Sequence, residues 1–119
     1  MNGVKVTRLS EAEKYTAPGH TDTVHTMWLQ HKSLGCEAPY WMGCSYYLPG
    51  SEAEWGASPL DKIYVVLEGE LTINFDDGSV KLGRMDSIFI GPNVNRQIVN
   101  ETNEVVTMLV VMPYPPADS

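Results

Sequence analysis

The stretch from Gly50 to Gly69, GSEAEWGASPLDKIYVVLEG, decides the fold of this chain of 119 residues. Its second half alternates: in an extended chain the residues at 62, 64 and 66 share one face and those at 63, 65 and 67 share the other. β-Branched and aromatic side chains predominate there, as is typical of strands, and glycine follows, as is typical of turns. We therefore predict a β-strand over 62–67 that ends in a turn at Glu68-Gly69.

Further strands are predicted on both sides of this stretch, because similar segments recur at short intervals with turn formers between them. No segment has a sustained apolar repeat of 3.6 residues, so we expect little helix. Many short strands with tight turns indicate an all-β antiparallel sandwich or barrel. The predicted strands cover 23–30, 40–48, 71–75, 87–90, 96–99 and 105–112, with a shorter one near Val4–Thr7.

Charge and composition limit the partners of the chain. Lys and Arg total 8 against 15 for Asp and Glu, which gives a formal net charge of -7. We expect neither nucleic-acid binding nor an anionic membrane surface, since both require basic patches. No apolar run approaches the ~20 residues that span a bilayer, and no secretory signal is evident. With two cysteines in a domain of ordinary size, a cytoplasmic protein is expected.

Two motifs in the chain are similar to those of the cupin superfamily. Gly50 and Gly69 match the ends of the first motif, and the second maps to Gly83, Asp86, Pro92 and Asn100. The resemblance covers roughly residues 35–113 and implies a single-domain jelly-roll β-barrel. We expect an N-terminal arm over 1–21, the cupin barrel over 22–113 and a proline-rich tail over 114–119.

The resemblance also implies where a metal would be bound, and the residues there are unsuited to it. Family positions for three histidines and a glutamate fall on Gly56, Ser58, Arg96 and Lys62. Glycine has no side-chain donor atom, and protonated lysine and arginine have no lone pair to give to a cation. We therefore expect no metal and no cofactor at this site.

Two cations at metal-ligand positions suggest a different chemistry. Strand alternation places Lys62 on the face that the family directs inward, where a charge needs a partner or a ligand. We hypothesise that Lys62 and Arg96 hold the carboxylate or enolate of a small organic acid. The alternative is an internal ion pair of Lys62 with a carboxylate such as Glu52 or Glu54.

Other side chains complete the candidate site. Tyr64 has the same strand parity as Lys62, so its hydroxyl could donate to an oxyanion. Only one of Tyr46 and Tyr47 can face the cavity, and the sequence does not decide which. The candidate catalytic residues are Lys62, Tyr64, His20 and Glu54, and the candidate substrate-binding residues are Arg96, Ser58, Tyr46 and Trp55.

These residues support an enzyme or a binding protein. An enzyme would be a metal-independent homodimer, paired through N-terminal strands, that moves a proton beside a carbonyl as an isomerase, epimerase or lyase. A non-catalytic sensor that binds an acidic metabolite would use the same two cations. A third alternative is a metal site built from His20, His25 and His31.

Overall fold

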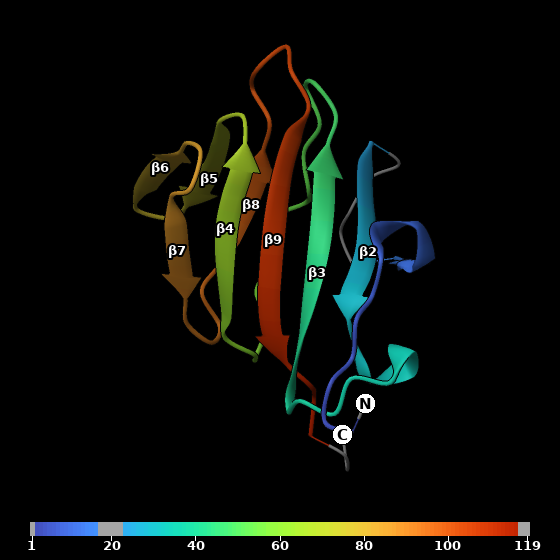
Figure 1. The fold of residues 1–119 in the computed structure, drawn as a ribbon. Helices are drawn as coiled ribbons and strands as arrows, with labels where there is room; N and C mark the ends of the chain where they lie inside the picture. Colours follow the sequence, from blue (N-terminus) through green and yellow to red (C-terminus); the bar gives the residue numbers. More distant parts are fainter. Residues whose placement is uncertain (1, 17–22, 117–119) are drawn as a thin grey trace.

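The computed structural model describes residues 2–16 and 23–116 and consists of strands joined by turns and loops. Six strands form one antiparallel sheet in the order β1-β2-β3-β9-β4-β7 (Figure 1). Three form a second antiparallel sheet in the order β6-β5-β8. The strands are β1 (Glu13–Tyr15), β2 (Val24–Gln30), β3 (Tyr40–Tyr47), β4 (Lys62–Glu68), β5 (Leu71–Phe75), β6 (Gly78–Leu82), β7 (Ser87–Ile90), β8 (Arg96–Val99) and β9 (Val106–Pro113).

The prediction of an all-β fold is confirmed. Helical structure in the described residues is limited to the 3-10 turns η1 (Leu9–Glu11) and η2 (Lys32–Leu34). Neither turn is long or apolar enough to cross a membrane.

The core lies between the two sheets. Leu71 and Ile73 of β5 are completely buried and pack in one cluster with Val66 of β4 and Met108 of β9. In the larger sheet, Val66 and Met108 alternate with more exposed neighbours along their strands, as expected for a sheet with one buried face. The buried face of β4 is the one that carries Lys62, Tyr64 and Val66, as the alternation and the family motif together predict.

Two residues of the cupin-like motifs, one in a turn and one in a loop, have clear structural roles. Gly69 has a φ of +89°, and a Cβ there would lie 2.9 Å from Cγ2 of Val106, so the turn after β4 requires glycine. Asn100 is fully buried, and its amide donates hydrogen bonds to the backbone oxygens of Tyr47 (2.9 Å) and Glu104 (2.7 Å). This side chain joins the end of β3 to the loop before β9.

Two details of the predicted strands were wrong. Residues 4–7 are not a strand: Val4 and Val6 are more than half exposed, and none of the described strands pairs with this segment. The N-terminal strand is instead β1, which pairs with β2 of the same chain. β6 was missed because its first four residues are exposed and only Leu82 is buried, which leaves little apolar alternation to detect.

The smaller sheet covers only part of the larger one. In Figure 1 its strands lie behind the β4, β7 and β9 side, whereas β2 and β3 extend beyond it. The segment after β3 runs along the edge of β8, to which it is joined by bridges between Glu52 and Val99 and between Gly56 and Arg96. This arrangement leaves room between the segment and the inner face of β1–β3.

Candidate functional site

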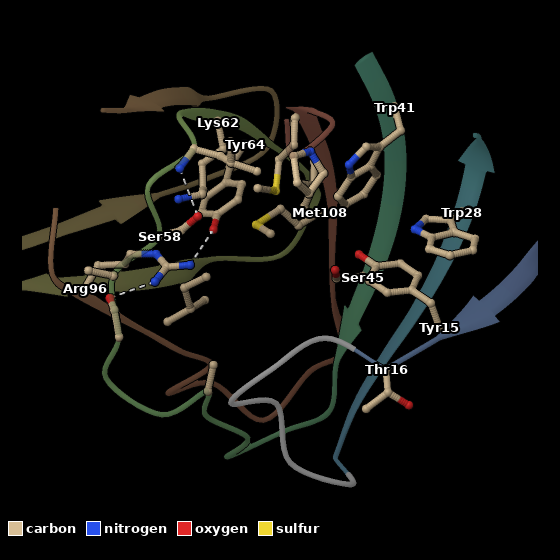
Figure 2. Close-up of a pocket in the computed structure, with 18 of the residues that line it drawn as sticks. Tyr15, Thr16, Trp28, Trp41, Ser45, Ser58, Lys62, Tyr64, Arg96 and Met108 are labelled. Carbon is tan, nitrogen blue, oxygen red and sulfur yellow. Dashed lines mark hydrogen bonds between the residues drawn. The ribbon is translucent and has the colours of Figure 1, made fainter. Parts of the chain in front are cut away.

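A cavity of about 790 Å3 occupies this space, a volume that suits a small-molecule ligand. Side chains of β1, β2, β3, β4, β8 and β9 line it, together with the segment over 53–60 and the residues after β9. The cavity has two chemically different ends (Figure 2). We call Ser58, Lys62, Tyr64 and Arg96 the cationic end, and Tyr15, Trp28, His31, Trp41 and Tyr114 the aromatic end.

Arg96 anchors the cationic end. It is the first residue of β8, and its backbone exchanges hydrogen bonds with Gly56 at 3.0 and 3.1 Å. The guanidinium Nη1 also donates to the Gly56 carbonyl at 2.7 Å, while Nη2 lies 3.5 Å from the Tyr64 hydroxyl, at the limit of a hydrogen bond. Its Nε is buried without a hydrogen-bond partner in the described residues. The guanidinium is thus held in place with donor capacity left for a ligand.

Lys62 is the most unusual side chain of the cavity. It begins β4, is only 3% exposed, and its Nζ makes no hydrogen bond to any described residue. Burial and the neighbouring Arg96 guanidinium lower the pKa of Lys62 from 10.5 to about 8, against the opposing effect of Asp61. From the sequence, an ion pair between Lys62 and Glu54 was an alternative. No hydrogen bond joins the Lys62 Nζ to Glu54, which is exposed at the cavity wall. An amine buried without a partner is costly unless a ligand contacts it.

Tyr64 and Ser58 complete this end. Tyr64 is 4% exposed, and burial raises the pKa of its phenol, an effect that Arg96 partly offsets. Its hydroxyl therefore stays protonated at neutral pH as a potential donor. The Ser58 hydroxyl accepts a hydrogen bond from the Leu60 backbone at 3.1 Å, which orients the start of the segment leading into β4.

The residues at this end do not fit a metal ion. Gly56, Ser58, Lys62 and Arg96, which the resemblance assigns to the family's metal-ligand positions, all line the one cavity. Among them only the serine oxygen is a neutral donor atom, and the two cations would repel a divalent metal. Within residues 2–16 and 23–116, no three His, Cys, Asp or Glu side chains lie together as metal ligands would.

The aromatic end is a stack of rings. The rings of Tyr15 and Trp28 are nearly parallel, with their centroids 5.1 Å apart. The His31 ring stacks on Trp28 with a centroid distance of 3.6 Å. Trp41 meets Tyr15 edge-on at 5.6 Å, and Tyr114 meets His31 edge-on at 5.3 Å. Burial and the adjacent Lys32 lower the pKa of His31 below its usual 6.5, so its ring is neutral at pH 7. Such a surface suits a flat or ring-bearing group.

Gly43 and a β-bulge build the aromatic end. A Cβ at Gly43 would lie 2.9 Å from the Trp41 ring and 3.3 Å from the Tyr15 hydroxyl, so glycine lets both rings lie over β3. In β2 the register against β3 shifts between Trp28 and Gln30. This bulge ends the period-two alternation, and His31 consequently stacks with Trp28 on the cavity side.

The remaining predicted site residues do not form one cluster. Glu54 and Trp55 line the cavity from its exposed rim, and Trp55 is 47% exposed. His25 is exposed and does not line the cavity, whereas His31 does, so the two do not form one site. His20 lies outside the described residues, and the predictions that involve it stay predictions.

Of the two neighbouring tyrosines of β3, Tyr47 lines the cavity and Tyr46 does not. Tyr46 is absent from the lining and pairs in register with His25 and Thr107, on the opposite face of the sheet. Ser45 shares the inner face with Tyr47, and its buried hydroxyl lacks a hydrogen-bond partner in the described part of the chain. Ser45 was not predicted as a cavity residue, although it shares strand parity with Trp41 and Tyr47, which is the signal that links the three.

Comparison with known proteins agrees with this geometry. Residues 45–112, more than half of the chain, match the family described as Cupin domain. The chain belongs to the cupin family. This cupin is 37% identical over 115 residues to a protein of Mycobacterium tuberculosis named Beta-D-galactosidase Rv1717, with 97% of this chain and 98% of that protein covered.

Solved structures with low sequence identity share the fold of this cupin. The polyketide cyclase RemF from Streptomyces resistomycificus is 18% identical, with a TM-score of 0.81 over 92% of this chain and 79% of RemF. A Thermotoga maritima protein described as a predicted oxalate decarboxylase is 21% identical, with a TM-score of 0.77 over 93% of this chain and 100% of its own. At these identities the likeness concerns the fold alone.

Proposed function

We propose that this cupin binds a small organic acid without a metal ion, with the acidic group at the cationic end. The observation that carries the proposal is the pair of Lys62 and Arg96, which both line one cavity and whose Nζ and Nε atoms are buried without a hydrogen-bond partner in the described residues. Arg96 supplies a permanent charge for a carboxylate or enolate, and the Tyr64 hydroxyl next to it supplies a neutral donor. The aromatic end then contacts the body of the ligand, which favours an acid that carries a ring.

We further propose that the bound acid undergoes proton transfer beside a carbonyl group. Lys62 is suited to this reaction because an amine with a pKa near 8 exchanges protons readily at neutral pH. Tyr64 and Arg96 would stabilise the enolate that forms, and Glu54 or His20 would carry the proton to or from solvent. The reaction class is an isomerase or lyase. A binding protein without turnover would use the same contacts, and a predicted homodimer is compatible with either.

Calorimetry with a matched pair of compounds tests the binding site. Phenyllactate carries a ring and a carboxylate, and 3-phenyl-1,2-propanediol has the same skeleton without the charge. We expect the acid to bind and the diol to bind much more weakly, and we expect the double variant Lys62→Met/Arg96→Gln to lose this preference. Equal affinities for acid and diol in the native protein would contradict the proposal.

A second candidate function is hydrolysis of β-galactosides, which the name of the Mycobacterium tuberculosis relative suggests. Glycosidases generally use two carboxyl groups that flank the scissile bond. Among the described residues Glu54 is the one carboxylate that lines the cavity. Release of nitrophenol from nitrophenyl β-D-galactoside, and its loss in Glu54→Gln but not in Glu104→Gln, would support this function over the first. Glu104 is exposed and does not line the cavity, so its variant is the matched control.

A further inference from the structure

Lys62 and Arg96 are adjacent cations with different chemical capacities. Arginine remains protonated in proteins, whereas a lysine amine loses its proton more readily when it is buried or lies near another positive charge. Lys62 is 3% exposed, and no described carboxylate accepts a hydrogen bond from its Nζ to keep it protonated. A neutral amine with a free lone pair is a nucleophile toward carbonyl carbon.

The positions of Lys62 and Arg96 suit them to contact different groups of one ligand. Lys62 and Tyr64 are two residues apart on the inner face of β4, and the Tyr64 hydroxyl is 3.5 Å from Nη2 of Arg96. Arg96 therefore reaches across from β8 to the same end of the cavity as Lys62 (Figure 2). A ligand carboxylate bound by the Arg96 guanidinium would hold the ligand carbon bonded to that carboxylate close to the Lys62 amine.

We propose that Lys62 forms an imine with the carbonyl carbon of a 2-oxo acid whose carboxylate is held by Arg96. This inference rests on the organic-acid site proposed above and names its substrate class. In a 2-oxo acid the carbonyl carbon is bonded directly to the carboxylate, which matches the adjacent positions of the two side chains. The aromatic end would receive the rest of the molecule.

The reaction balances without an oxidant or reductant. The lone pair of the Lys62 nitrogen forms a bond to the carbonyl carbon, and the carbonyl oxygen takes up the two amine protons and leaves as water. The product is a carbon–nitrogen double bond, which becomes an iminium ion on protonation. The iminium withdraws electrons from the neighbouring carbon and so promotes loss of a proton there, which is the reaction class proposed above.

Reductive trapping tests the imine. The full-length protein is incubated with phenylpyruvate and sodium cyanoborohydride, and peptide mass mapping locates any adduct. We expect one dominant adduct at Lys62, with the mass of the oxo acid plus two hydrogens minus one water. Its formation should saturate with phenylpyruvate, be prevented by phenyllactate, and be slowed about tenfold or more by Arg96→Gln through loss of the carboxylate contact.

Matched variants separate the imine from nonspecific labelling. Lys62→Arg keeps a positive charge but removes the nucleophile, so it should lose the saturable adduct. Lys62→Met serves the same purpose if the larger arginine disturbs packing. Lys81→Met removes an exposed lysine of β6 outside the cavity and should label as the native protein does.

The outcomes also distinguish this inference from the proposed function. If phenyllactate and phenylpyruvate both bind but no adduct forms at Lys62, the organic-acid site stands and the imine is wrong. If labelling is spread over exposed lysines and is equal in Lys62→Arg, the imine is likewise wrong. If neither compound binds, the proposed organic-acid site fails and the imine fails with it.

Discussion

The two ends of the cavity differ in chemistry and in origin. The cationic end lies within residues 45–112, the part of the chain that matches the cupin family, and it concentrates two cations and a phenol. The aromatic end comes from β1, from β2 and the residue after it, from the start of β3 and from the residue after β9, all outside that match. Under the proposed function, the part of the chain that matches the cupin family would supply the groups that hold the acid, and the flanking segments would supply the surface that contacts the body of the ligand.

The largest expected effect is at Arg96. Arg96→Gln removes a charged donor from the carboxylate, so affinity for phenyllactate should fall by about 10- to 100-fold. Arg84→Gln is the matched control because Arg84 is an exposed arginine paired with Glu68. If the two variants bind phenyllactate equally well in calorimetry, the cationic end does not hold the acid.

Lys62 should affect the stability of the protein without ligand. Lys62→Met removes a buried amine that has no hydrogen-bond partner in the described residues, so the free energy of unfolding at pH 7 should rise by about 1–2 kcal/mol. The exposed substitution Lys81→Met should change it by less than about 0.5 kcal/mol. Urea unfolding measures both, and a loss of stability in Lys62→Met would show that Lys62 has an internal partner.

The gain from Lys62→Met should shrink at alkaline pH. The pKa of Lys62 is about 8 in the folded protein and 10.5 when unperturbed, so between these values the unfolded chain binds more protons. The stability of the native protein therefore rises with pH across this window relative to Lys62→Met, which lacks the titrating amine. A difference between the two proteins that stays constant from pH 7 to pH 10 would contradict the lowered pKa.

The aromatic end should matter only for ligands with a ring. Trp28→Ala removes a stacking surface, so affinity for phenyllactate should fall about fivefold, whereas affinity for lactate, which has no ring, should not change. Circular dichroism verifies that the variant is folded, since Trp28 also packs on Tyr15 and His31. A similar loss for both acids would mean that the two ends do not act separately.

The smallest effect concerns the charge of the aromatic end. NMR titration of the His31 imidazole should give a pKa below 6.5, because burial and the adjacent Lys32 disfavour the charged ring. Lys32→Met removes one of these causes and should therefore raise the pKa of His31. An unchanged or lower value in the variant would contradict the contribution of Lys32.

The cationic end could be predicted partly from local rules and partly from the family resemblance. Lys62 and Tyr64 share a face of one strand by period-two alternation. Arg96 was related to them only through the similarity of both motifs to those of cupins. The protonation of Lys62 could not be fixed from sequence, since it depends on which other groups approach the amine in the folded chain.

The all-β fold, most of the strands and the family can be inferred from the amino-acid sequence, because alternation, turn residues and motifs act over a few neighbouring positions. Which rings meet at the aromatic end depends on how the strands are paired in the folded chain. Tyr15, Trp28 and Trp41 are brought together by the register of three strands, and the bulge after Trp28 turns His31 toward the cavity. Register and bulges are set by packing over the whole sheet, so no local pattern in the chain encodes them.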